Sequence, residues 1–468
     1  MIGLVVSRAD RASEHVGEHV LDLVAWDEHE DDSRDAEAGG GTYYTRPGFE
    51  LRTFDALHLH LDGVASAFAD PSLVCFLSRH SGETGPLLSA HFTGNFGPAE
   101  YGGGDGELAR ACPAAQQAVV AGLADHAPDG YEVGIECTHH GPSDVGAPSM
   151  FVELGSSDAE WDDPAGARAV ARAVLDLDGA AADHVDGART RHVVGFGGGH
   201  YAPRFARVVR ETDWAVGHVG ADWPLEAMGP VGDNHDVLRA AFEESAADLA
   251  LVDGDRPRLV DAVESLGYRV VSETYLRATD GVPRSLADRV EDGLGPVDEG
   301  VRFGAHARVG AGNRTSDASE RPAVAFDVAD LSREFVDAAL GVDAAAARAA
   351  VADHTVAFHT EENGRRPTGR VALPTAADAA DADGGSASFD RLVDALCDLL
   401  RTRYDEVSRE DEAVVARERA FDAAAAADLG VPEGPAFGRL AGGEPVEVDG
   451  REVTPEDVHR DRTVRFSV

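Results

Sequence analysis

Short apolar runs alternate with helical patterns through the first two thirds of the chain, and this alternation limits the possible folds more than any other feature. Residues 2–7 (IGLVVS) have the continuous apolar character of a buried strand, and residues 10–23 place apolar side chains at helical spacing. Strands that alternate with helices are typical of α/β proteins. We therefore expect a mixed, largely parallel sheet that is flanked by helices.

Further elements follow the same pattern. Strands are expected in residues 56–63, 72–80, 131–142 and 148–157 and at the start of 191–205 and 213–226. Helices are expected at 162–177, where a proline falls in the first turn, and at 256–265 before another strand. The acidic, glycine-rich residues 27–41 are expected to form a surface loop. Polar clusters follow several strands, and the carboxyl ends of strands are where open α/β sheets bind ligands.

The charge of the chain points to a salt-rich environment. Its 468 residues carry a formal net charge of −44, and all 41 basic residues are arginine. Such an excess of acid destabilises a compact state by self-repulsion, which molar salt screens. We expect a cytoplasmic protein of a salt-loving organism; an acidic interaction surface is the alternative. Because this adaptation removes the basic surface of a typical nucleic-acid binder, the charge excludes neither tRNA nor DNA.

Composition and length suggest two to three domains. We expect a catalytic α/β core at 1–305, an acidic helical extension with a flexible linker at 306–405, and a small module at 406–468. The four cysteines form no CxxC pair, which fits a reducing cytoplasm, and we expect them to be inert core residues. The first apolar run turns charged within a few residues, so neither a signal peptide nor a membrane span is expected.

Four clusters rich in histidine, glycine and acidic or amide side chains follow expected strands. They occupy residues 78–96, 136–157, 195–204 and 217–224. No G-x-S-x-G elbow, H-E-x-x-H motif or Walker A motif is present. The clusters alone indicate a hydrolase-type pocket that is rich in histidine and glutamate, with or without a metal, and that activates a water molecule.

The second cluster places His139 and His140 between two carboxylates, Glu136 and Glu153. Zinc binds neutral imidazole and carboxylate groups, so this set is a candidate metal site. Adjacent residues on a strand point to opposite faces, so one of the two histidines would face a given ion unless the backbone turns at Gly141–Pro142. The alternative is a pair of turn histidines that cap a strand end.

The other clusters add polar groups. Three consecutive glycines, residues 197–199, precede His200, and their exposed N–H groups could hold an anion or an ester carbonyl; a tight turn is the alternative. The first cluster contains His91 and Asn95, preceded by an arginine and a histidine at 79–80. Arginine suits phosphate because of its forked donors. His218 lies within an apolar run and fits a core histidine better than a ligand.

Four motifs in this order resemble a known family. SRHSGETGPLLSAHFTGNF, ECTHHGP, FVELGSS and GFGGGHYAPRF, with VGHV after them, are similar to the archaeal and plant type of D-aminoacyl-tRNA deacylase. The resemblance covers about residues 1–305. It implies hydrolysis of the ester between a D-amino acid and the tRNA 3′ adenosine, with one or two zinc ions per subunit. It also implies a core similar to peptidyl-tRNA hydrolase and phosphorylases, and a monomer that uses neither DNA nor a membrane.

The resemblance also assigns roles to the motif residues. The implied catalytic residues are His140, Glu153, Asn95 and His200. The implied metal ligands are Glu136, His139, His140, His200 and His91. The implied tRNA-binding residues are Arg79, His80, Gly198, Gly199, Tyr201 and Arg204, with Arg207 beside them. Asn95 and the glycine loop would hold the oxyanion.

Two alternatives stay open at this point. A metal-free enzyme that resembles peptidyl-tRNA hydrolase or a nucleoside phosphorylase could use the same fold. A non-catalytic tRNA-binding or ribosome-associated module would bind RNA without turnover, although it has no need of histidines at four strand ends.

Overall fold

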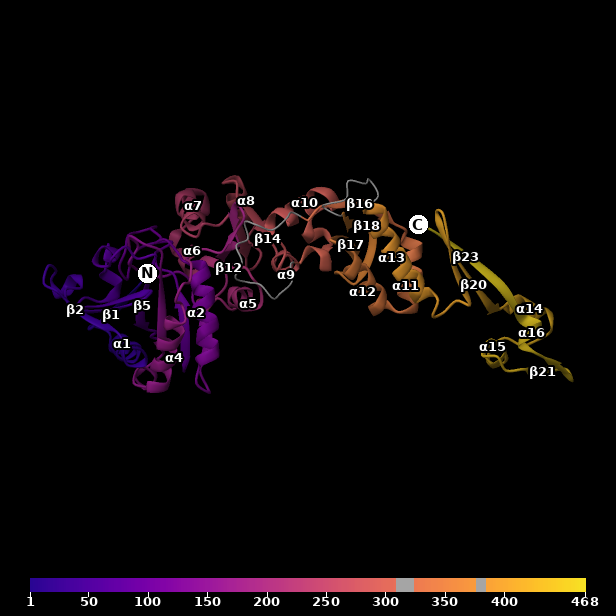
Figure 1. Ribbon diagram of the computed structural model, residues 1–468, viewed down its shortest axis with the longest axis horizontal. Helices are drawn as coiled ribbons and strands as arrows, with labels where there is room; N and C mark the ends of the chain where they lie inside the picture. The colour runs from indigo at the N-terminus through magenta and orange to yellow at the C-terminus, as the bar shows by residue number, and fades with distance from the viewer. Residues whose placement is uncertain (309–323, 376–383) are drawn as a thin grey trace. The chain divides into compact units, whose positions relative to one another are not determined.

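The structure, a computed structural model, describes residues 1–308, 324–375 and 384–468 (Figure 1). The described chain forms two compact units, one from Met1 to Asp280 and one from Gly281 onward. The division at residues 305 and 405 stays a prediction. Of residues 374–390, where the flexible linker was expected, 376–383 lie outside the described residues and 384–390 begin a helix.

An eight-stranded mixed sheet forms the centre of the first unit. In spatial order it contains β2 (Asp27–Asp31), β3 (Gly41–Arg46), β4 (Phe49–Phe54), β1 (Ile2–Ser7), β5 (Leu73–Arg79), β8 (Ser149–Gly155), β6 (Leu87–His91) and β7 (Glu132–Ile135). The four strands from β4 to β8 run parallel, whereas β6 runs antiparallel to β8 and carries β7 parallel to itself. The mixed α/β fold expected from the sequence is confirmed.

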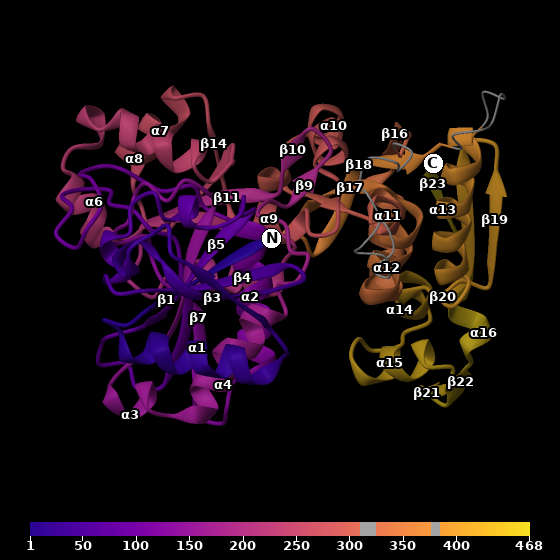
Figure 2. The same ribbon diagram turned by 60° about the vertical axis from the view of Figure 1, so that its left-hand side comes forward.

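A second sheet of the same unit is wholly parallel. It contains β12 (Ala215–Gly220), β11 (His192–Phe196), β13 (Leu249–Val252) and β14 (Arg269–Val271). The helices of the unit are α1 (Arg11–Leu23), α2 (Pro113–His126), α3 (Asp158–Trp161), α4 (Pro164–Leu175), α5 (Pro203–Glu211), α6 (Asp222–Met228), α7 (His235–Glu243), α8 (Pro257–Ser265) and α9 (Glu273–Ala278). Helices α1 and α4 pack side by side (Figure 2). The short strands β9 (Val185–Asp186) and β10 (Arg189–Thr190) form a hairpin.

Helix α1 shows how the local sequence builds this layer. The Asp10 side chain accepts a hydrogen bond from the Ser13 amide and so caps the first turn. Ala12, Val16 and Val20 recur every four residues and are fully buried. The helix therefore presents one apolar stripe to the sheet, and its buried cap is held beside the carboxyl end of β5.

Two expected elements differ in the structure. Residues 56–63 were expected to form a strand, but they contain the 3₁₀ turn His58–His60. His58 and Leu61 are the buried members of this stretch, and a spacing of three matches a 3₁₀ turn rather than a strand. The expected loop at 27–41 contains β2, whose pairing with β3 gives its polar residues backbone partners.

The second unit has its own sheets and cores. A four-stranded sheet contains β15 (Val301–Phe303), β17 (Ala357–Glu361), β18 (Arg366–Pro374) and β16 (Phe326–Leu331), and a three-stranded sheet contains β19 (Glu406–Glu410), β20 (Ala413–Phe421) and β23 (His459–Ser467). The main helices are α10 (Arg284–Leu294), α11 (Arg333–Val342), α12 (Ala344–His354) and α13 (Gly384–Leu400). Residues 306–405 thus contain strands as well as helices.

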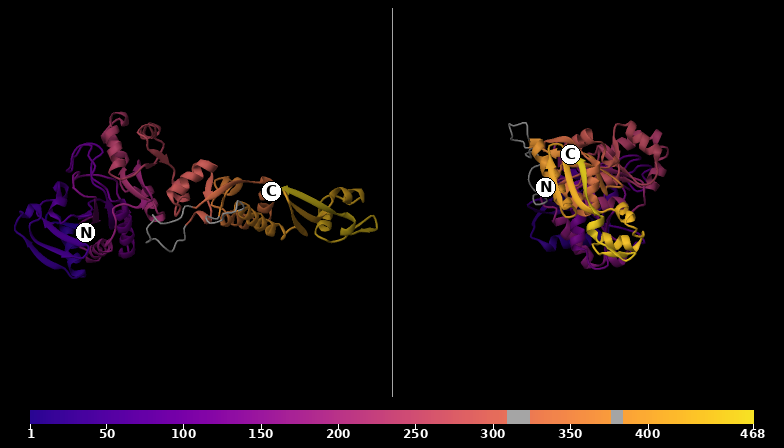
Figure 3. Two further views of the ribbon diagram at one scale, coloured as in Figure 1. Left: turned by 45° about the horizontal axis from the view of Figure 1, so that its top comes forward. Right: turned by 90° about the vertical axis from the view of Figure 1, so that its right-hand side faces the viewer.

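A small helical part is inserted between β20 and β23. It contains α14 (Ala423–Asp428), α15 (Pro435–Ala441), β21 (Val446–Val448), β22 (Arg451–Val453) and α16 (Pro455–Val458). It lies beyond the ends of the two long strands (Figure 3) and encloses a core of its own, which includes Leu440 and Val458. In the part of the chain that the structure describes, no helix has the length and apolar character needed to cross a membrane.

Candidate active site

The candidate site lies on one face of the eight-stranded sheet. Glu153 of β8 pairs with Ser78 of β5 on one side and with Ser89 of β6 on the other. Phe151, two residues earlier on the same face, pairs with His91 of β6. The sequence predicted that ligands bind at the carboxyl ends of strands, and the residues after β1, β4 and β5 that line the site, Asp10, His58 and His80, agree with this. Because β6 runs opposite to β5 and β8, it brings His91 to this site across the sheet face.

The segment after β7 connects the two sheets of the unit. The Cys137 amide donates to the His200 carbonyl over 2.8 Å, and the Thr138 amide donates to the Val219 carbonyl over 2.8 Å. These bonds bring the end of β12 and the glycine-rich loop after β11 to the histidine pair. The chain then turns, because His140 adopts a left-handed φ of 52°.

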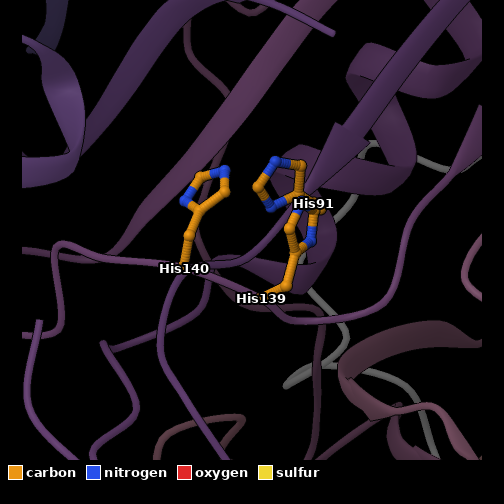
Figure 4. A group of neighbouring side chains, drawn as sticks. All are labelled: His91, His139 and His140. Carbon is orange, nitrogen blue, oxygen red and sulfur yellow. The ribbon is translucent and has the colours of Figure 1, made fainter. Parts of the chain in front are cut away.

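This turn decides how the adjacent histidines lie. The rings of His139 and His140 are 4.4 Å apart between centroids, and both lie within 5 Å of the His91 ring. Figure 4 shows the three rings gathered from two segments of the chain. The alternative in which the backbone turns and both histidines serve one site is therefore the one that the structure adopts.

Hydrogen bonds select the tautomer of all three rings. The Nδ1 atoms of His91, His139 and His140 lie 3.0, 2.8 and 2.8 Å from backbone carbonyl oxygens. A carbonyl can only accept, so each Nδ1 carries the proton and each Nε2 is left to bind something else. The buried Nε2 of His91 has no hydrogen-bond partner. One nitrogen from each ring lies within 4.8 Å of the others, which suits the imidazole ligands of a metal ion.

The electrostatics of the site favour neutral imidazoles at two positions. Burial, together with the charge of His91, lowers the pKa of His139 to about 3, and burial beside His139 lowers that of His140 as well. Burial raises the pKa of Glu153 to about 7. Its Oε1 lies 3.5 Å from Nε2 of His91, whose pKa is raised because Glu153 outweighs the effect of burial. Glu153 can thus take up and release a proton near neutral pH.

A second group adjoins the three histidines. The buried Glu136 carboxylate accepts hydrogen bonds from Ser89 over 2.5 Å and from His200 over 2.8 Å, and Nε2 of His80 lies 3.7 Å away. Burial favours neutral Glu136, but the bond from His200 and the nearby histidines outweigh it and lower its pKa. Burial lowers the pKa of His200, yet its bonds with Cys137 and Glu136 raise it to about 10.

Three overlapping groups could hold a metal ion among the described residues. They are His91 with His139 and His140, Cys137 with His139 and His200, and His80 with Glu136 and His200. Cys137 is buried, as expected for a core residue, and its Sγ also lies 3.4 Å from Nδ1 of His200. Its position between Glu136 and His139 in the sequence was the signal that Cys137 could belong to the site.

These groups open onto a pocket of about 610 Å³. The predicted site residues on its wall are Arg79, His80, Asn95, Glu136, His139, His140, Glu153 and His200. Four other predicted residues, Gly198, Gly199, Tyr201 and Arg204, do not line it, and His91 is buried behind the wall residues. The sequence reasoning missed Asp10 and His58, which also line the pocket. They lie in segments without a recognisable motif.

The three predicted arginines differ in what they contact. Arg204 is paired with Asp253 and Glu273, and Arg207 is paired with Glu273 as well. Arg79 lies over the Trp161 ring at 5.3 Å, and among the described residues no carboxylate pairs with its guanidinium. Arg79 is therefore the pocket arginine whose donors can reach a phosphate.

The side chain of Asn95 is hydrogen-bonded to a loop of the protein. Its amide nitrogen donates to the carbonyls of Gly102 and Gly104 over 2.9 and 3.3 Å. These bonds hold residues 97–106 against the pocket. The oxyanion role of Asn95 stays a prediction, and its visible contacts are those of a loop anchor.

His218 is a core residue, as the sequence favoured. Its ring nitrogens lie 3.0 Å from Thr138 Oγ1 and 2.8 Å from the Ala109 carbonyl, and burial lowers its pKa to about 4.

This burial predicts a pH effect on stability. The unfolded histidine titrates near 6.5. The contribution of neutral His218 is therefore complete above that pH and is lost as the pH falls from about 6.5 to about 4, by about 3 kcal/mol. We expect His218→Gln, which cannot titrate, to flatten the pH dependence of urea unfolding by this amount in molar potassium chloride. Parallel curves for the two proteins would contradict the assignment.

Several known proteins are similar to this chain in sequence, and one solved structure is similar to part of its fold. Residues 67–271 match the family model of D-aminoacyl-tRNA deacylase. A D-aminoacyl-tRNA deacylase of Halorubrum lacusprofundi is 52% identical over 100% of this chain and 97% of its own, and that of Natronomonas pharaonis is 52% identical over 100% of both. The deacylase of Methanoregula boonei is 32% identical over 98% of this chain and 96% of its own.

One solved structure is similar to part of this chain. The crystal structure of AF0625, described as a conserved protein of unknown function, is 27% identical with a TM-score of 0.52. It covers 59% of this chain and 96% of its own, so its chain has no counterpart for much of this one. The Methanoregula relative, in contrast, spans nearly the whole length. On this similarity, the chain belongs to the D-aminoacyl-tRNA deacylase family.

Proposed function

We propose that this protein hydrolyses the ester bond of D-aminoacyl-tRNA and releases free tRNA and the D-amino acid. Family membership supports the reaction. Three histidines, His91, His139 and His140, are the observation that assigns the reaction to particular residues. Their Nδ1 atoms are all bonded to backbone carbonyls. Such a set leaves three Nε2 atoms for one ligand and belongs in a hydrolytic site rather than in a passive binding surface.

Zinc is the proposed cofactor. The neutral imidazoles of His139 and His140 and the unpartnered Nε2 of His91 fit a divalent ion, and the adjoining group of Glu136, His80 and His200 could hold a second. A zinc ion bound there would supply a Lewis acid for the ester carbonyl and for a water molecule.

The protein's own groups would do the remaining work. Glu153, whose pKa is raised to about 7 by burial, would take the proton from the attacking water and return it to the 3′ oxygen that leaves. Arg79 would bind a phosphate of the tRNA 3′ end. The wall of the pocket would exclude L-amino acids by steric clash rather than by added affinity for the D-form.

The proposed setting follows from the substrate. We propose that the protein acts as a monomer in the cytoplasm of a salt-loving organism, where its substrate is made. The acidic surface agrees with this setting, because molar salt screens the repulsion among its carboxylates.

The test is deacylation of D-tyrosyl-tRNA beside L-tyrosyl-tRNA in about 3 M potassium chloride. We expect rapid cleavage of the D-ester alone. A chelator should abolish this cleavage, and added zinc should restore it. Cleavage that withstands the chelator and extends to N-blocked L-peptidyl-tRNA would instead favour a peptidyl-tRNA hydrolase. Binding of tRNA without cleavage of either ester would favour a non-catalytic module.

A further inference from the structure

The exposed aromatic rings of the described chain gather at the candidate site. Three aromatic side chains are exposed by more than a third: Tyr101 at 65%, Trp223 at 49% and Tyr201 at 39%. Tyr101 and Trp223 lie on the wall of the pocket. Tyr201 contacts the rings of His80 and His200, which also line it. Exposed rings that concentrate at one pocket mark a binding surface rather than scattered surface residues.

The two rings on the wall are held close to the histidines. The Tyr101 carbonyl accepts a hydrogen bond of 2.9 Å from the amide of Gly141, the residue after His140. Trp223 lies in the first turn of α6, and its ring is nearly parallel to that of His200, at 25° and 6.4 Å between centroids. The Tyr101 backbone is thus bonded to the residue after His140, the Trp223 ring lies beside His200, and about half or more of each side chain remains exposed.

The chemistry of the wall indicates what covers these rings. Arg79 is the one arginine on the wall, while Glu100 lies directly before Tyr101. A surface with so few cations gains little from phosphate contacts, and molar salt weakens such contacts further. Unpaired nucleobases stack on aromatic side chains without needing charge.

We propose that Tyr101 and Trp223 bind the unpaired nucleobases at the 3′ end of the tRNA by stacking, and thereby place the ester against the histidines. The inference rests on the proposed function and adds the residues that recognise the nucleic acid. The terminal adenine is the base closest to the ester, so its removal should weaken tRNA binding most.

The experiment uses deacylated tRNA as the probe, so binding is measured without turnover. Affinity for a complete tRNA is compared with affinity for the same tRNA lacking its terminal adenosine, in about 3 M potassium chloride. The wild-type protein should bind the complete tRNA more tightly by about tenfold, the order expected for one stacked base. Trp223→Ala and Tyr101→Ala, singly and together, should reduce this preference, whereas Trp223→Phe and Tyr101→Phe should retain most of it.

Kinetics provide the second measurement. In deacylation of D-tyrosyl-tRNA, the alanine variants should raise KM by about tenfold or more, with a smaller change in kcat. Val185→Ala removes an exposed apolar side chain of β9 that does not line the pocket, and it should change neither quantity.

The outcomes separate the two proposals. Equal affinity for both tRNAs in the wild-type protein, or alanine variants with unchanged preference and KM, would overturn the stacking inference while deacylation stands. The wild-type protein could instead prefer the complete tRNA, lose this preference in the alanine variants, and cleave neither ester. That result would support the stacking inference and overturn the proposed function.

Discussion

His139→Ala is expected to abolish zinc binding and to slow deacylation of D-aminoacyl-tRNA by about a thousandfold, or about 4 kcal/mol. His139 belongs to two of the three groups that could hold a metal, and its ring lies within 5 Å of those of His91, His140 and His200. The loss of His139 therefore removes a candidate metal ligand and the ring that the other three imidazoles contact.

The measurement pairs zinc content by mass spectrometry with single-turnover deacylation in molar potassium chloride. His126→Ala is the matched control, because His126 pairs with Asp176 on the surface, and such pairs contribute little. It should retain both the zinc and the rate of the wild type. A His139→Ala protein with normal zinc content and normal turnover would refute the metal site, and so would a wild-type protein that binds no zinc.

Glu153→Gln is expected to lower kcat by about a hundredfold to ten-thousandfold while zinc remains bound. The amide has nearly the same shape as the carboxylic acid but cannot take up a proton. Glu153 lies on the pocket wall, is 3% exposed, and has a pKa raised to about 7 by burial, so it can accept and release a proton at neutral pH.

The control for this change is Glu132→Gln, which alters an exposed carboxylate on strand β7 of the same sheet in the same way. Circular dichroism and zinc content should match the wild type for both variants. If Glu153→Gln kept kcat within a few-fold of the wild type, proton transfer would have to be assigned to another group, and His80 or His200 would be examined next.

Much of the candidate site could be predicted from short motifs. His139, His140 and Glu136 lie within five residues of one another, so one turn of the backbone suffices to bring them together. His91 and Glu153 end up beside them because the strands that carry them, β6 and β8, are neighbours in the sheet. The family resemblance points to the same residues.

Other features could not be predicted from local pattern. The role of Asn95 depends on where residues 97–106 fold back, and the pairing of Arg204 depends on Asp253 and Glu273, far along the chain. The reversed direction of β6 also lies beyond local pattern, because an isolated apolar run does not record whether its neighbour runs parallel or antiparallel.

By itself the sequence determined the mixed α/β class, the strongly acidic character and the residue types of the site, because these follow from periodicity, composition and motifs that are local in the chain. Only the tertiary structure decided that the site lies on a sheet face, that Arg79 rather than Arg204 has free donors, and that Tyr101 and Trp223 stand exposed beside the histidines. Each of these depends on contacts between residues that are distant in sequence. Such contacts are selected by the packing of the whole unit, not by the local preference of any segment.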